Sequence, residues 1–252
     1  MIIQVAIVIF VYVTILFVIA HFMEDNTIAD IFWGPGFVVI AAFTLMQAPG
    51  WDVRKMVVSI LVLLWGVRLA FHILLRKKGQ GENFRYLQWR ETWKYFKIKS
   101  YLRIFLLQGL FMLIISAPVW FIDSMPNAPL TFWDHIGLIV FGIGFFIEVT
   151  ADSQLIRYKK DPAFKGKLIN KGLWGISRHP NYFGEALLWW GISLYAVSLP
   201  WGWITLISPL FLTILLRFVT GVPVMDKRLQ RFPGWDEYKQ QTAPFVPFAK
   251  FL

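Results

Sequence analysis

The sequence contains no cysteine, and only 16% of its 252 residues are charged. Without thiols, the chain can form no disulfide, no thiolate nucleophile and no cysteine-bound zinc or iron–sulfur site. Its four histidines (His21, His72, His135 and His179) are far apart and form no HxxxH pair, so we expect no metal site. Glycine-rich phosphate loops of the GxxxxGK and strand-borne GxGxxG kinds are also absent.

The low charge accompanies a high apolar content. Hydrophobic residues make up 57% of the chain and its mean hydropathy is +0.57, whereas about a quarter of a soluble domain is charged. The apolar runs approach the roughly 20 residues that cross a bilayer as a helix, and they do not alternate as barrel strands do. The sequence therefore predicts an all-α integral membrane protein with seven transmembrane helices. These spans are expected near 2–21, 33–49, 56–75, 102–122, 134–155, 181–199 and 202–220.

The basic residues gather on one side of this topology. Twenty-two of the 25 Lys and Arg lie in 76–103, in 157–178 and from residue 217 onward, after the third, fifth and seventh spans. The positive-inside rule places these segments and the C-terminus in the cytoplasm and the N-terminus outside. The net charge of +10 then reflects topology and attraction to anionic lipids rather than nucleic-acid binding. We expect a bacterial inner membrane, and the oligomeric state stays open.

A polar cluster stands out in the run GLWGISRHPNYFGEALLWWG, residues 172–191. Pro180 suits the first turn of a helix, so the sixth span should begin beside it, with free N–H groups that bind anions. Arg178 would add a cation for a phosphate. Glu185 lies one turn beyond Asn181 on the same face, where a carboxylate needs a partner or a proton. An ion pair of Glu185 with Arg178 is the structural alternative.

The fifth span carries a second polar group, Glu148 and Asp152, four residues apart on one helix face. Two acids on a membrane helix line a cavity or meet cations, so either a pocket facing Glu185 or a charge network near the cytoplasmic end is expected. Gly142 and Gly144 on the same span favour close helix packing.

A polar stripe of Arg68, His72 and Arg76 marks the third span. Arg76 can extend to the interface, but Arg68 is deeper and should face the protein interior. Asp30, at the entrance to the second span, could pair with Arg68 or His72, or could belong to a catalytic site.

The run GLWGISRHPNYFGE resembles the C-terminal signature of the steroid 5α-reductase superfamily, and in particular its bacterial DUF1295 branch. The resemblance covers most of 136–247 and includes Asp152 with QLIRYKK behind it and the terminal pattern PGWDEYKQQTAPFVPF. It implies an NADPH-dependent reductase of carbon–carbon double bonds in a seven-helix membrane domain. The whole chain, 1–252, would be a single membrane domain, with the substrate side in 1–122 and the cofactor side in 123–252.

The resemblance also implies residue roles. Asn181 and Glu185 match positions that hold the nicotinamide end of NADPH, and Asp152 matches a position that contacts the adenosine part. The positions along the phosphate and ribose path are matched by Arg157, Lys159, Arg178, His179 and Tyr182.

The N-terminal half departs from the family pattern. Steroid-reducing members hold the substrate ketone with a Tyr on the third span and an acid on the second. Here Trp65 stands where that Tyr should be, and Asp30 or Gln47 could replace the acid. The expected substrate is therefore a lipid-like enone, sterol-like or isoprenoid compound taken from the bilayer.

A reductase of this kind needs a hydrogen-bond donor for the developing enolate oxygen. The candidates are Asp30, if burial keeps it protonated, then His72 and Tyr86.

Two alternatives remain open. Isoprenylcysteine and phospholipid methyltransferases, which use S-adenosylmethionine, carry a related Arg-His-Pro-x-Tyr-x-Gly run. Asp152 and the Asn-Tyr-Phe-Gly-Glu form of the motif resemble the reductases, and the tail VMDKRLQR has the single acid Asp226 where the methyltransferases have a Glu pair. A non-catalytic lipid-binding membrane protein is the other alternative.

Overall fold

The computed structural model describes residues 1–77, 79, 81–164 and 166–249, and this part of the chain is helical without β-strands. The elements in chain order are α1 (Ile2–Phe22), α2 (Thr27–Ile31), α3 (Trp33–Met46), α4 (Val53–Lys77), α5 (Phe84–Thr92), α6 (Phe96–Ser100), η1 (Tyr101–Leu106), α7 (Leu107–Ile115), α8 (Ala117–Ser124), α9 (Phe132–Lys160), η2 (Pro162–Phe164), η3 (Gly172–Gly175), α10 (Pro180–Val197), η4 (Gly202–Leu206), α11 (Ile207–Ile214), η5 (Leu215–Val219), α12 (Val222–Leu229) and α13 (Trp235–Gln241). Here η1 and η5 are π-helical turns and η2, η3 and η4 are 3₁₀ turns.

Five helical segments of the described chain are long and apolar enough to cross a membrane, which confirms an all-helical integral membrane protein. They are Ile2–Phe22, Val53–Lys77, Phe96–Ile115, Phe132–Lys160 and Gly202–Leu229. Each overlaps one of the seven expected spans.

The other two expected spans are helical as well, but they are weaker membrane candidates. Trp33–Met46 has only 14 residues, and Pro180–Val197 begins with the polar Asn181 and Glu185. The count of seven and the orientation of the termini therefore stay predictions. The fourth span, expected over 102–122, ends earlier, at Ile115. Pro118 in the first turn of α8 starts a new helix there, because proline cannot continue the preceding one.

The chain forms two compact units, which are described separately. The first comprises residues 1–131 and 195–205, and the second comprises 132–194 and 206–252.

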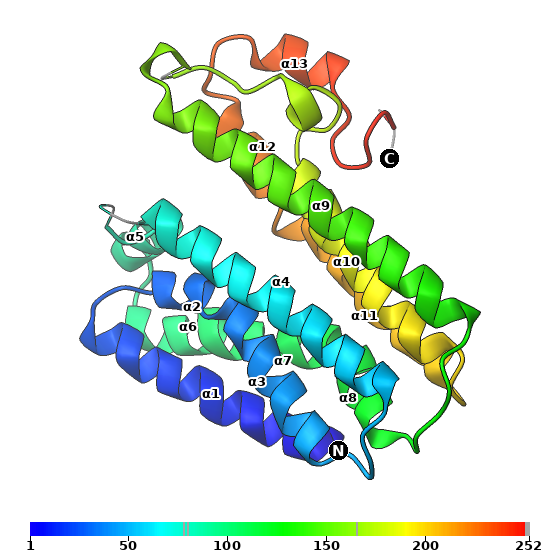
Figure 1. Ribbon diagram of the computed structural model, residues 1–252. Coiled ribbons are helices and arrows are strands. Elements are labelled where there is room, and N and C mark those ends of the chain that lie inside the picture. The colour runs from blue at the N-terminus through cyan, green and yellow to red at the C-terminus, as the bar shows by residue number, and fades with distance from the viewer. Residues whose placement is uncertain (78, 80, 165, 250–252) are drawn as a thin grey trace. The chain divides into compact units, whose positions relative to one another are not determined.

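In the first unit, α3 and α4 lie side by side (Figure 1) and approach each other at two glycines. A Cβ atom on Gly34 would lie 2.4 Å from the carbonyl oxygen of Gly66, so no larger residue fits. Beside this contact the ring of Trp65 meets that of Phe37 edge to face at 5.3 Å. Trp65 is fully buried, so it serves as a core residue here.

In the second unit, glycines bring α9 and α10 together. A Cβ on Gly144 would lie 2.5 Å from the backbone nitrogen of Leu188, and one on Gly184 would lie 2.7 Å from that of Glu148. The prediction of close packing is confirmed for Gly144. The prediction is wrong for Gly142, where a Cβ would meet nothing within 4 Å. Residues two positions apart on a helix point to different sides, so Gly142 does not share the packed face of Gly144.

The C-terminal segment of the second unit folds back onto the loop that precedes α10. The hydroxyl of Tyr238, in α13, donates to the carbonyl of Trp174 at 2.7 Å. Ser177 donates to the carbonyl of Phe245 at 2.7 Å. The segment therefore forms one wall of the polar cluster.

Candidate functional site

Helix α10 begins at Pro180, as its sequence predicts. The residue before it, His179, is held by a hydrogen bond from its own backbone nitrogen to the Ser177 hydroxyl at 3.2 Å. Both residues are buried within the second unit, so the polar cluster at the helix start is an ordered part of the fold.

Arg178 faces the C-terminal segment, and both terminal nitrogens of its guanidinium bind protein groups, while its Nε has no hydrogen-bond partner among the described residues. It donates to the carbonyls of Lys239 and Thr242 at 3.1 and 2.9 Å, and pairs with the Asp226 carboxylate at 2.9 Å. Its guanidinium carbon also lies 5.6 Å from the centre of the Trp235 ring. In this arrangement Arg178 fastens the C-terminal segment to the loop before α10.

Asp226 binds a second member of the cluster. Its other carboxylate oxygen lies 2.8 Å from Nε2 of His179, and because a carboxylate only accepts, His179 donates. The imidazole stacks on the Tyr182 ring at 5.5 Å, with 10° between the planes. Burial lowers the pKa of His179, although the Asp226 carboxylate acts in the opposite direction. The imidazole is therefore neutral at pH 7.

Asn181 and Asp152 meet across α9 and α10. The Asn181 amide nitrogen donates to the Asp152 carboxylate at 3.3 Å. The Asn181 amide oxygen is buried and has no hydrogen-bond partner among the described residues. Asp152 and Glu148 are both buried, and Glu185 is half-buried. The two polar groups expected from the sequence are thus joined through Asn181.

The remaining cations expected on the phosphate path, Arg157 and Lys159, are exposed near the end of α9. Arg157 lines a pocket of about 370 Å³ together with Lys171 and the stacked rings of Tyr158 and Phe164. These cations, unlike Arg178, can meet an anion that comes from solvent.

In the first unit, Asp30 and Tyr86 are brought together across 56 residues. The Tyr86 hydroxyl donates to Asp30 at 2.5 Å, and the same carboxylate accepts from Asn83 at 3.1 Å and pairs with Arg85 at 3.3 Å. Burial raises the pKa of Tyr86 well above its usual value, and the Asp30 charge adds to this effect. The phenol therefore stays protonated.

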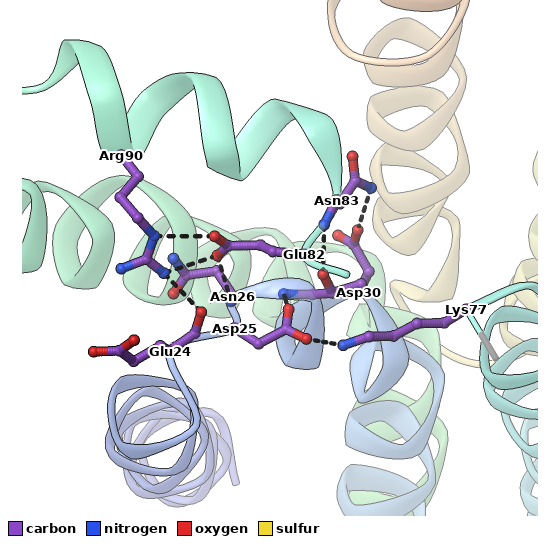
Figure 2. A network of polar contacts seen from close by, with 9 residues as sticks. Glu24, Asp25, Asn26, Asp30, Lys77, Glu82, Asn83 and Arg90 are labelled. Atoms are coloured by element: carbon purple, nitrogen blue, oxygen red, sulfur yellow. Dashed lines mark hydrogen bonds and ion pairs between the residues drawn. The ribbon is translucent and has the colours of Figure 1, made fainter. Parts of the chain in front are cut away.

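Asp30 belongs to a larger polar network that ties the α1–α2 turn to the start of α5 (Figure 2). Glu82 accepts from the backbone of Asn26 at 2.8 Å and pairs with Arg90 at 3.0 Å. The backbone of Asn83 donates to the Thr27 hydroxyl at 2.8 Å. His72, the third candidate donor, is buried in α4.

Sequence reasoning missed three residues of these clusters. Asp226 was considered only as the single acid that stands where the methyltransferases have a Glu pair. Its position just after the last expected span was a signal that it could pair with a cation. Asn83 and Arg85 adjoin the candidate Tyr86 in the run ENFRY, and that density of polar groups beside a span could have drawn attention to them.

Comparison with known proteins supports the resemblance carried by the α10 motif. The model of the family described as "Protein of unknown function (DUF1295)" matches residues 16–242. An uncharacterised protein of Schizosaccharomyces pombe is 29% identical over 168 residues, which are 56% of this chain and 48% of that protein. No solved structure matches.

Plant reductases are similar over shorter stretches. Steroid 5-alpha-reductase DET2 of Gossypium hirsutum is 35% identical over 83 residues, 32% of this chain and 31% of that protein. The Delta(14)-sterol reductase of Arabidopsis thaliana is 34% identical over 92 residues, 32% of this chain and 24% of that protein. The matches thus span about half the length of the yeast protein and less than a third of the plant reductases. With its family match over most of the sequence, the chain belongs to the DUF1295 family within the steroid 5α-reductase-like superfamily.

Proposed function

We propose that this protein is a membrane-embedded oxidoreductase that uses NADPH to reduce a carbon–carbon double bond in a lipid-like substrate. The observation that supports it most directly is the unpaired amide oxygen of Asn181, buried beside Asp152 at the start of α10. Partial similarity to a steroid 5-alpha-reductase and a sterol reductase points to the same chemistry. The substrate would be an enone, sterol-like or isoprenoid compound from the bilayer.

The residues of the second unit fit a nicotinamide cofactor. A buried acceptor without a donor is uncommon, and the NH₂ group of a carboxamide would satisfy the Asn181 oxygen, with Glu185 as a second acceptor one turn further along the helix. The phosphates would meet Arg157 and Lys159. His179 and Tyr182 would form an ordered edge of the site, and Arg178 would position it by holding the C-terminal segment.

The residues of the first unit would act on the substrate. When bound, NADPH would supply a hydride to the β carbon of the double bond, and a proton would be added at the α carbon. As negative charge develops on the substrate oxygen, a positioned donor lowers the barrier. Tyr86 is the best placed candidate, because its hydroxyl is protonated and positioned beside Asp30. To act as the donor, it would turn its single O–H from the Asp30 carboxylate to the substrate oxygen.

The other two candidates take different roles in this proposal. Asp30 accepts from Tyr86, Asn83 and Arg85, so we assign it to positioning Tyr86 rather than to proton donation. In this proposal the pair would take the part that the family pattern gives to a Tyr on the third span and an acid on the second. His72 remains a candidate for relaying a proton within α4.

A binding experiment distinguishes this function from the alternatives. Calorimetry on the purified protein in lipid nanodiscs should show NADPH binding and no S-adenosylmethionine binding. Asn181→Ala should weaken NADPH binding about tenfold or more, since it removes the amide group that meets the carboxamide. The exposed Asn170 provides the control variant Asn170→Ala, which should bind as the wild type does.

The other outcomes are equally informative. Binding of S-adenosylmethionine without NADPH would establish the methyltransferase alternative. Binding of neither would contradict both enzyme assignments and favour the non-catalytic alternative. Unchanged NADPH affinity in a folded Asn181→Ala variant would refute the cofactor assignment at α10.

The cofactor site is proposed to face the cytoplasm of a bacterial inner membrane, with seven spans, the C-terminus inside and the N-terminus outside. The supporting observation is that the exposed Arg157 and Lys159 follow the long apolar part of α9, as the positive-inside rule expects.

A further inference from the structure

A pocket in the first unit, outside the Asp30–Tyr86 cluster, has the composition of a lipid-binding site. Its volume is about 420 Å³, and it lies between the end of α1 and the segment that joins α5 to α6. Phe17, Ala20 and Phe96 supply apolar walls, while Arg90 and Lys97 supply cations. This combination suits a ligand with a hydrocarbon part and an anionic part.

The position of the pocket along the helices separates these two parts. It lies at the end of the first long apolar helix, Ile2–Phe22, and at the start of the third, Phe96–Ile115. Both helix ends therefore meet where hydrocarbon gives way to headgroups. Below this level Phe10, which lies seven residues before Phe17 on the same face of α1, is exposed, and an acyl chain can lie against it.

The charge around the pocket favours an anion. Residues 92–122 contain four basic residues, Lys94, Lys97, Lys99 and Arg103, and no acidic residue. The nearby acids are Glu24, which contributes to the lining, Glu82, whose carboxylate is bound by Arg90, Asp25, which pairs with Lys77, and the exposed Glu91. The side chain of Lys97 is exposed at the pocket, and the balance of the segment is positive.

Asn26 in the pocket wall lacks a hydrogen-bond partner for its amide hydrogens. Its residue exposure is 3%. Its amide oxygen accepts from the Ser100 hydroxyl at 3.1 Å, but its amide nitrogen has no partner among the described residues. Asn26 and Arg90 both line the pocket, and in Figure 2 both are drawn on the opposite side of the network from Asp30. A buried donor next to a cation can be satisfied by an anionic oxygen.

Aromatic packing keeps this wall in place. The guanidinium of Arg90 lies 4.5 Å from the centre of the Phe96 ring, and its Nη2 donates to the carbonyl of Glu24 at 3.0 Å. Phe17 packs on Tyr101 at 4.8 Å. The pocket is therefore built by side chains that are themselves fixed, rather than by a loose surface.

We propose that this pocket binds an anionic phospholipid from the surrounding leaflet. The phosphate would lie among Arg90, Lys97 and the amide of Asn26, and the upper acyl chain would lie against Phe17 and Phe96. This site is independent of the proposed reductase function, because none of its residues belongs to the proposed cofactor or donor groups.

Native mass spectrometry with titrated lipid tests the proposal. The wild-type protein released from detergent should retain phosphatidylglycerol in preference to phosphatidylcholine, with one tighter site. Lys97→Gln and Asn26→Asp should each weaken that site about fivefold or more, the first by removing a cation and the second by placing a negative charge beside the phosphate. Lys167→Gln, an exposed lysine of the second unit, is the matched control and should have no effect.

Three results would overturn the proposal. Equal retention of the two lipids would exclude headgroup recognition. Equal phosphatidylglycerol affinity in wild type and Lys97→Gln would place the lipid elsewhere, and this exposed substitution is not expected to disturb folding. Competition by inorganic phosphate at the same concentration as the lipid would show that the pocket binds free anions instead.

Discussion

The hydroxyl of Tyr86 lies 2.5 Å from the carboxylate of Asp30 and donates to it, although the two residues are 56 positions apart. A hydrogen bond between a phenol and a carboxylate is charge-assisted and short. It fixes the rotation of the phenol in a buried setting and makes Tyr86 the group on which the proposed chemistry can be tested most directly.

Replacing Tyr86 with phenylalanine should lower kcat for enone reduction about 100-fold or more, because it removes the proposed donor while keeping the ring. The measurement is NADPH oxidation by the protein in nanodiscs with an enone substrate. Tyr95, whose residue exposure is 68%, gives the control Tyr95→Phe. Full activity in a folded Tyr86→Phe protein would exclude the phenol as donor.

Replacing Asp226 with alanine should destabilise the second unit by about 3 kcal/mol, because it leaves the buried guanidinium of Arg178 without its counter-charge. Chemical denaturation in detergent measures the change. Asp236→Asn, at an exposed acid of α13, should leave the stability unchanged. If both variants unfold at the same denaturant concentration, the Arg178–Asp226 pair has no role in stability.

Acidification should destabilise the protein through His179. Because burial lowers the pKa of His179 in the folded state, the unfolded chain takes up a proton near pH 6.5 and the folded chain takes it up only at lower pH. The contribution of His179 to the free energy of unfolding is complete above pH 6.5, and it is lost as the pH falls through the folded-state pKa. The Asp226 carboxylate opposes this shift, while Arg178 adds to it.

The check is the slope of unfolding free energy against pH below 6.5. It should be smaller in His179→Gln than in wild type, and His135→Gln, at an exposed position, should leave it unchanged. An identical slope in all three proteins would assign the acid sensitivity to other groups.

Two glycines of α9 should respond oppositely to alanine. Gly144→Ala should lower the free energy of unfolding by about 1–3 kcal/mol, because its Cβ would meet the backbone of α10 at 2.5 Å. Gly142→Ala should leave the free energy of unfolding unchanged or raise it, because its Cβ would meet nothing within 4 Å and alanine favours the helix more than glycine does. Thermal unfolding in the same detergent compares the two. A loss of stability in Gly142→Ala equal to that in Gly144→Ala would show that packing against α10 is not the cause.

Local signals in the sequence predicted much of this molecule. The long apolar runs predicted helices, five of which the structure shows to be long and apolar enough to cross a membrane, and Pro180 predicted the start of α10. These features depend on composition and on the backbone constraints of neighbouring residues. The break of the fourth span at Ser116 was missed because hydropathy continues through Pro118 without a change.

Partner choice was not predictable in the same way. Arg178 was expected to face a phosphate or Glu185, but it pairs with Asp226, 48 residues away. Asp30 was expected to pair with Arg68 or His72 or to belong to a catalytic site, and the structure pairs it with Tyr86 and Arg85. Several acids compete for each cation in such a chain, and only the tertiary packing decides among them.

The attachment of Arg178 to the carbonyls of Lys239 and Thr242 also has a consequence for biosynthesis. The corner at the start of α10 needs residues that are translated some 60 positions later, so it is incomplete while the apolar helices are being inserted. A nascent chain that stalls before Asp226 would therefore leave the Arg178 guanidinium without the carboxylate that pairs with it.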